Sequence, residues 1–136
     1  MNMLRTKQVA VIRKDLNMRK GKIAAQVAHA SMKVILDMMS KEVVNTDIEK
    51  WQLVLFKRSP LYEWLNGKFT KIVLWVETEE ELMMLYKKAK GAGLPCSYII
   101  DSGFTEFHGN KTLTCIAIGP DDVDKINEIT GELPLL

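Results

Sequence analysis

The fold of this chain follows most directly from VAVIRKDLNMRKGKIAAQVAHAS, residues 9–31. The first four residues form a short apolar run, and three of them are β-branched, which predicts a buried strand. A basic loop follows, and a helix is expected to begin between Met18 and Gly21 and to continue to about Ser40. Since α/β proteins place ligands where a strand ends and a helix begins, this stretch is also a candidate for part of a functional site.

The expected helix has one polar stripe beside a broad face of small residues. At 3.6 residues per turn, a narrow sector contains Lys22, Gln26, His29 and Lys33. The two sectors beyond it contain Ile23, Val27, Ala30 and Val34, and then Ala24, Ala28, Ser31 and Ile35. We therefore expect the helix to bury a wide, small-residue face that approaches the sheet or another helix closely.

The rest of the chain predicts further strands and helices in alternation. Strands are expected at 69–76, 96–100 and 112–118, the last one ending at Gly119-Pro120, and helices at 60–65, from the capping Thr78 to about residue 90, and at 121–129. Residues 41–47 are polar and predict a loop, while 51–56 fit either a strand or a helix. The expected fold is α/β: a small mixed sheet of about four strands with helices on both faces, a three-layer α/β/α arrangement in a single domain of residues 1–136.

The composition limits the function classes. The chain has 136 residues, 47% hydrophobic and 26% charged, with a formal net charge of +2, which is ordinary for a globular protein. Cys96 and Cys115 lie in apolar runs without CxxC spacing, and the two histidines form no HExxH motif, so neither a metal nor a cofactor is expected. The N-terminus lacks the apolar region of a signal peptide, and no apolar run approaches 18 residues, so we expect a cytoplasmic protein without a membrane partner.

Charged residues are unevenly distributed along the chain. Basic residues gather between Arg5 and Lys22 and again at Lys87, Lys88 and Lys90, whereas acidic residues gather at 77–81 and 121–124. This uneven distribution of charge would let one face of the protein bind phosphate groups. An ordinary solvated surface explains the same pattern, so both interpretations stay open.

Asp101 and Thr105 are the clearest candidates for chemistry outside the first helix. Asp101 ends an expected strand, and Thr105 lies four residues on, beyond Gly103, so an acid and a hydroxyl could together hold a water molecule and an ester. The alternative is a turn capped by the Asp101 side chain, with Gly103 in a left-handed conformation. Lys20 and Lys22 follow a strand as phosphate-binding residues do, but GxxxxGK[ST] is absent, which disfavours a Walker-type nucleotide site.

Several ordered motifs resemble the archaeal and eukaryotic (type II) peptidyl-tRNA hydrolases. They are VIRKDLNMRKGKIAAQVAHAS, KIVLWVETEEEL, GLPCSYIIDSGFT, TLTCIAIGP and the terminal ITGELPLL. The resemblance covers most of the chain, although the segment from Val43 to Arg58 is longer than is usual for the family. It implies a mixed four-stranded sheet, a homodimer, and metal-independent hydrolysis of the ester that joins a peptide to the terminal ribose of tRNA.

The resemblance also implies roles for individual residues. The family's proposed catalytic lysine, aspartate and threonine correspond to Lys22, Asp101 and Thr105, and Gln26 and His29 correspond to positions that line the same cleft. The chain differs from the family at Phe104, where an arginine is usual, and at Glu106 and His108 in the same loop.

The resulting hypothesis is that Asp101, helped by Thr105, orients a water molecule that attacks the ester, while Lys22 stabilises the oxyanion or a nearby phosphate. Gln26 and His29 would position the terminal adenosine or the carbonyl group. Arg19, Lys20 and Lys87 to Lys90 would bind phosphates of the acceptor stem. Two alternatives remain: a relative that binds tRNA without turnover because of the changed loop at Phe104, and a protein-interaction domain of the same fold.

Overall fold

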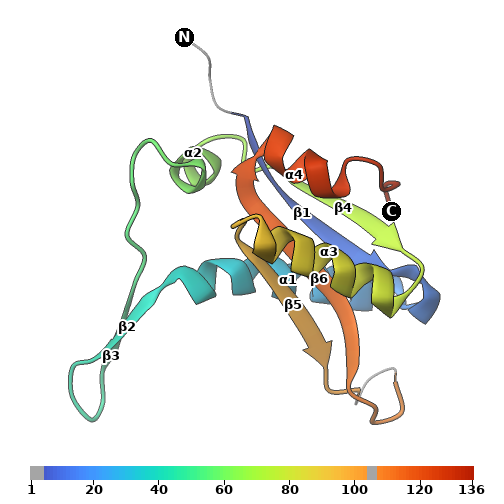
Figure 1. Ribbon diagram of the computed structural model, residues 1–136. Coiled ribbons are helices and arrows are strands. Elements are labelled where there is room, and N and C mark those ends of the chain that lie inside the picture. The colour runs from blue at the N-terminus through green and yellow to red at the C-terminus, as the bar shows by residue number, and fades with distance from the viewer. Residues whose placement is uncertain (1–4, 104–106) are drawn as a thin grey trace.

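The structure is a computed structural model and describes residues 5–103 and 107–136. Its elements alternate as the sequence predicts (Figure 1), in the order β1 (Thr6–Arg13), the 3-10 turn η1 (Lys14–Leu16), α1 (Lys20–Met38), β2 (Ser40–Val43), β3 (Glu49–Gln52), α2 (Pro60–Asn66), β4 (Lys71–Val76), α3 (Glu79–Gly91), β5 (Cys96–Asp101), β6 (Thr112–Asp122) and α4 (Val123–Thr130).

The main sheet has four strands in the order β4-β1-β6-β5, which confirms the predicted mixed sheet. β1 pairs in parallel with β4, while β6 runs antiparallel to both β1 and β5. β4 and β5 therefore point the same way but form opposite edges of the sheet. The carboxyl ends of β1, β4 and β5 meet at one end of the sheet, which is where ligands bind in open α/β sheets.

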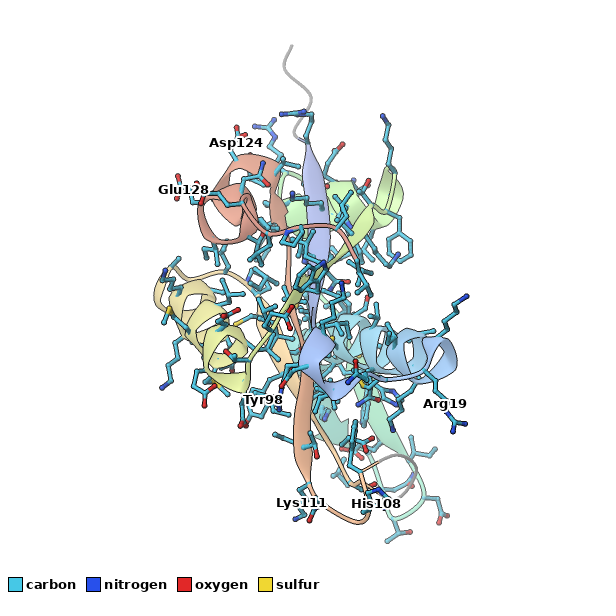
Figure 2. The ribbon with its side chains drawn as sticks, turned by 90° about the vertical axis from the view of Figure 1, so that its right-hand side faces the viewer. Arg19, Tyr98, His108, Lys111, Asp124 and Glu128 are labelled. Atoms are coloured by element: carbon cyan, nitrogen blue, oxygen red, sulfur yellow. The ribbon has the colours of Figure 1, made fainter. Side chains whose placement is uncertain are left out.

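Helices cover both faces of this sheet, as predicted. α1 packs on one face through Ala30 and Val34, which join a buried cluster with Ala10 and Ile12 of β1. α3 and α4 pack on the other face around Leu82, Leu85 and Ile126. Figure 2 shows α1 and α3 on opposite sides of the sheet.

The two predicted helix starts at Ser59-Pro60 and Thr78 are confirmed with their capping bonds. The Ser59 hydroxyl accepts a hydrogen bond from the Tyr62 N–H at 3.2 Å, and Pro60 occupies the first position of α2. Thr78 does the same for α3 by accepting from the Glu81 N–H at 3.1 Å. These bonds satisfy N–H groups that lack partners inside a helix.

The segment between α1 and α2 differs from the sequence prediction. Residues 41–47 were expected to form a loop, but Ser40–Val43 pairs with Glu49–Gln52 as an antiparallel hairpin that projects away from the main sheet (Figure 1). Its turn is stabilised by the Asn45 side chain, which accepts a hydrogen bond from the Asp47 N–H at 2.8 Å. The ambiguous run 51–56 is strand only at residues 51 and 52.

β6 also differs from the prediction. It does not end at Gly119-Pro120 but continues to Asp122, because Asp121 and Asp122 pair with β1 after a shift in register. Gly119 allows this path: its φ is +96°, and a Cβ there would lie 2.6 Å from the Lys7 carbonyl oxygen. α4 consequently begins at Val123 rather than at residue 121.

The small-residue face of α1 is only partly buried, so that expectation was wrong in part. The close approach occurs at Ala30, whose carbonyl oxygen accepts a hydrogen bond from the Ser97 hydroxyl at 2.8 Å. Ala24 and Ala28 are exposed and line an open apolar groove between α1 and α2.

The last residues of the chain lie along the outer edge of β4. The Trp75 N–H donates to the Pro134 carbonyl, the Leu136 N–H donates to the Val73 carbonyl, and Leu74 and Leu135 form an antiparallel bridge. Backbone groups of an edge strand are thereby paired.

Candidate active site

Lys22 and Asp101 meet at the end of the sheet. The Lys22 Nζ lies 2.6 Å from Asp101 Oδ1, although the two residues are 79 positions apart in sequence. Lys22 comes from the first turn of α1, and Asp101 is the last residue of β5. Both side chains are mostly shielded from solvent, with 13% and 12% of their surface exposed. The structure thus brings together two of the three residues that the sequence selects for catalysis.

Asp101 is held by the backbone as well as by Lys22. Its Oδ2 accepts a hydrogen bond from the Gly103 N–H at 2.8 Å, and Gly103 has φ +87°. This is the capped turn that was the alternative interpretation of Asp101. The turn and the contact with Lys22 coexist, because each uses a different carboxylate oxygen.

The environment of Asp101 favours its ionised form. Burial raises the pKa of this carboxyl, but the hydrogen bonds from Lys22 and Gly103 and the charges of Lys22 and His29 outweigh burial, so the net pKa lies below its ordinary value. Asp101 is therefore a carboxylate at neutral pH. A lowered pKa makes it a weaker base, which suits orienting a water molecule better than removing its proton outright.

Gln26 was expected in the polar stripe but is buried, with 1% of its surface exposed. Its Nε2 donates to the Thr114 hydroxyl at 2.7 Å, and that hydroxyl lies 3.4 Å from the Ile99 carbonyl oxygen, to which it donates. Among the described residues, Gln26 Oε1 has no hydrogen-bond partner, and an unpaired buried acceptor is costly unless a ligand satisfies it.

The remaining predicted site residues on α1 are exposed. His29 lies close enough to Asp101 for its charge to lower the pKa of that carboxyl. Arg19 precedes the first turn of α1 and points away from the sheet in Figure 2, and Lys20 borders the apolar groove.

Part of the predicted site lies outside the described residues. Thr105 belongs to this part, together with Phe104 and Glu106, two of the positions that differ from the family. The described part of the same loop starts again at Phe107, and the centre of its ring lies 5.9 Å from the Lys22 Nζ. His108 follows near the tip of the loop (Figure 2).

Sequence reasoning missed Thr114 and Phe107, and it missed the role of Arg13. Thr114 had a signal, since it is a lone hydroxyl within the apolar run 113–118. Arg13 binds Asp15 at 2.8 Å and donates to the Leu113 carbonyl at 3.0 Å, which ties the loop before α1 to β6. Nothing in the local sequence pattern marks these pairings.

The two basic groups do not form one surface. Arg19 and Lys20 lie at the start of α1, whereas Lys87, Lys88 and Lys90 lie on α3 across the sheet (Figure 2). Arg19 and Lys20 therefore lie on the opposite side of the sheet from the three lysines of α3.

Other catalytic devices find little support in residues 5–103 and 107–136. No group of three or more His, Cys, Asp or Glu side chains there could hold a metal ion. Cys96 and Cys115 are free thiols, and burial raises the pKa of Cys115 to about 12, which keeps it protonated and unreactive. None of the helices in these ranges is both long and apolar enough to span a bilayer.

Comparison with known proteins gives a consistent result. A family model described as peptidyl-tRNA hydrolase PTH2 matches residues 6–136. The chain is 43% identical to a peptidyl-tRNA hydrolase of Sulfurisphaera tokodaii over 131 residues, covering 96% of this chain and 98% of that protein. It is 42% identical to a peptidyl-tRNA hydrolase of Methanocaldococcus jannaschii over 130 residues, covering 96% and 99%.

The fold also matches a solved structure of a protein of unknown function from Agrobacterium tumefaciens. The TM-score is 0.57 at 11% sequence identity, with 98% of this chain and 99% of the other covered. At this identity the likeness concerns the fold alone.

Proposed function

The chain belongs to the PTH2 family of peptidyl-tRNA hydrolases, and we propose from this that it hydrolyses the ester bond of peptidyl-tRNA, releasing free tRNA and a peptide. The observation that carries the proposal is the contact between Lys22 and Asp101, 2.6 Å apart at the ligand-binding end of the sheet. A cation and a carboxylate so placed can serve ester hydrolysis without a metal.

In the proposed reaction, Asp101 orients a water molecule whose oxygen attacks the ester carbonyl carbon. The oxyanion that forms is stabilised by the Lys22 ammonium, and the bond to the ribose oxygen then breaks as that oxygen receives the proton released by the attacking water. Thr105 is proposed to help hold the water. The lowered pKa of Asp101 supports this division of roles, since the carboxylate stays charged throughout.

Gln26 and His29 are proposed to position the substrate. The buried Gln26 Oε1 lacks a partner among the described residues, so a hydroxyl or amino group of the terminal adenosine would satisfy it. Arg19 and Lys20 are proposed to contact phosphates beside the same helix.

The test is peptide release from purified N-blocked aminoacyl-tRNA by the wild-type chain, Lys22→Ala and Asp101→Asn. We expect each variant to lose roughly 10²- to 10³-fold in kcat, by analogy with removal of one stabilising donor. Asp124→Asn, the same chemical change on α4 at the other face of the sheet (Figure 2), should keep full turnover. Unchanged turnover in both site variants would overturn the site assignment, and no turnover in the wild type would favour a tRNA-binding relative.

We further propose that two copies pair through the apolar groove beside α1, each copy being a single domain. The groove has a volume of about 900 Å³ and is lined by Ile23, Ala24 and Val27 of α1 and by Leu65 and Phe69. Open apolar surfaces of this kind mark interaction sites. Ala24→Glu should lower the mass measured by light scattering after gel filtration, whereas Ala25→Glu, the same change one residue along α1, should not; equal masses would refute this interface.

The proposed compartment is the cytoplasm, because the proposed substrate arises during translation. Free thiols at Cys96 and Cys115 are compatible with a reducing compartment. Localisation of the tagged full chain by microscopy would test this assignment.

A further inference from the structure

The β2–β3 hairpin has two different faces. Lys41 lies directly opposite Trp51 on one face, and the Lys41 Nζ sits 4.3 Å from the centre of the Trp51 ring. The other face carries Lys50 and Glu42, whose charged atoms are 3.8 Å apart. All eight strand residues are exposed, and a two-stranded hairpin of this size is marginally stable alone in water. An exposed indole on such a hairpin therefore suggests a binding role.

The face with Trp51 borders a pocket that is built on α1 and β5, the two elements that also carry the catalytic pair. The hairpin pocket, about 490 Å³ in volume, lies between the hairpin, α1 and β5, and its lining includes His29, Met32, Lys33, Lys41, Trp51 and Ile99. Ile99 precedes Asp101 by two residues on β5, which is roughly 7 Å along a strand. From Lys22 to Lys33, α1 rises by about 16 Å. The residues that line the hairpin pocket thus lie roughly 7–16 Å along β5 and α1 from the catalytic pair.

The chemistry of the hairpin pocket fits single-stranded nucleic acid. Trp51 is half-exposed, at 48%, and since Lys41 lies over one face of its ring, a base would stack on the opposite face. Lys33 and Lys41 border the same pocket, and cations beside an aromatic platform are the usual way to bind a nucleotide strand. Among the described residues of the lining, Asp37 is the one acidic side chain, and Lys33 pairs with it at 3.2 Å, so positive charge predominates there.

We propose that the hairpin pocket binds the single-stranded acceptor end of the tRNA, with Trp51 stacking on a base that precedes the terminal adenosine and Lys41 contacting a phosphate. This inference rests on the proposed function, since it assigns a second contact to the same substrate. It gives the long segment between α1 and α2 a role in recognising RNA. The peptide part of the substrate is the competing occupant.

The test compares two esters of the same N-blocked amino acid, one on full-length tRNA and one on adenosine alone. For the tRNA ester, Trp51→Ala should raise KM about tenfold and leave kcat unchanged, because stacking contributes binding without changing the reacting atoms. Trp51→Phe keeps an aromatic face and should recover most of the loss. The adenosine ester lacks the stacked nucleotide, so all three proteins should hydrolyse it equally.

Two further variants distinguish an effect of the Lys41 charge on tRNA binding from a general effect on the folding of the hairpin. Lys41→Ala should weaken tRNA binding and flatten its salt dependence. Lys50→Ala, the same change on the opposite face of the hairpin, should do neither, because its exposed ion pair contributes little. An equal loss on both esters would overturn the proposal in favour of the peptide, and an unchanged KM in Trp51→Ala would overturn it outright.

A direct binding measurement keeps this proposal distinct from the proposed hydrolase activity. Uncharged tRNA should quench the tryptophan fluorescence of the wild type and do so much less in Trp51→Phe, since Trp64 is buried, at 1% exposed, and Trp75 is partly buried on β4, at the sheet edge opposite β5. If the wild type does not hydrolyse the ester, the proposed function fails, yet this measurement still decides whether Trp51 binds RNA. Equal quenching in both proteins would refute the stacking role.

Discussion

Replacing Gly103 with alanine should damage both stability and catalysis, and Gly109 provides a matched control. The two glycines lie in the same loop with nearly equal backbone angles, φ +87° and +82°. An alanine at either position costs about 1–2 kcal/mol for the left-handed conformation. A Cβ at Gly103, however, would clash with the Asn110 carbonyl oxygen and lie 2.6 Å from the Asn110 backbone nitrogen, whereas a Cβ at Gly109 would meet nothing within 4 Å.

The difference between the variants follows from the bonds that Gly103 makes. Its N–H binds Asp101, and its carbonyl oxygen accepts from Phe107 and Gly109. Relieving the clash would lengthen one or more of these bonds, each worth about 1 kcal/mol. We therefore expect Gly103→Ala to lose roughly 2–4 kcal/mol and Gly109→Ala roughly 1–2 kcal/mol, and the difference of about 1–2 kcal/mol corresponds to about 4–8 °C in Tm for a chain of this size.

The assay is thermal unfolding of both variants beside steady-state hydrolysis of N-blocked aminoacyl-tRNA. Gly103→Ala should also lower kcat, because Asp101 loses a bond that fixes the orientation of its carboxylate. Gly109→Ala should keep kcat near the wild-type value. Equal Tm and equal kcat in the two variants would refute the reasoning that the Gly103 turn positions Asp101.

Three further predictions concern stability. The pKa of Asp101 is lower in the folded chain than its ordinary value of 3.8, so the ionised carboxylate stabilises the fold fully above about pH 5. This stabilisation is lost as the pH falls through the folded pKa. The difference in free energy of unfolding between the wild type and Asp101→Asn, measured by denaturant titration, should therefore narrow below about pH 4. Ser59→Ala should cost about 1 kcal/mol by urea unfolding, with Ser59→Asp retaining most of the stability. Leu82→Ala should cost about 3–5 kcal/mol because its side chain is fully buried, whereas Met84→Ala, 56% exposed on the same helix, should cost under 1 kcal/mol in the same measurement.

Local patterns in the sequence were sufficient for the elements whose signals are local. The caps at Ser59 and Thr78 and the alternation of strands and helices depend on neighbouring residues, and these predictions are confirmed. Pairing of Lys22 with Asp101 spans 79 residues, and in the sequence only the family resemblance indicates it. Their catalytic roles stay predictions.

The sequence-based predictions that were wrong share a physical cause. Helical periodicity says which residues share a face, but not what covers that face. Gln26 falls in a polar sector, yet it is buried because Thr114 supplies a partner from β6, and Ala24 is apolar but stays exposed because nothing described packs over it. The four-residue strands of the hairpin are too short for their periodicity to be distinguished from a loop.

The pairing of residues 134–136 with β4 has a consequence for solution behaviour. An unpaired edge strand is a template on which another chain can add a strand, and β4 is protected from this by hydrogen bonds to Pro134 and Leu136. A chain cut before Pro134 would expose those backbone groups together with the neighbouring wall of the groove, to which Leu136 contributes. Such a shortened protein should aggregate at concentrations at which the full chain does not. Residues 134–136 would then protect the edge of β4 from aggregation.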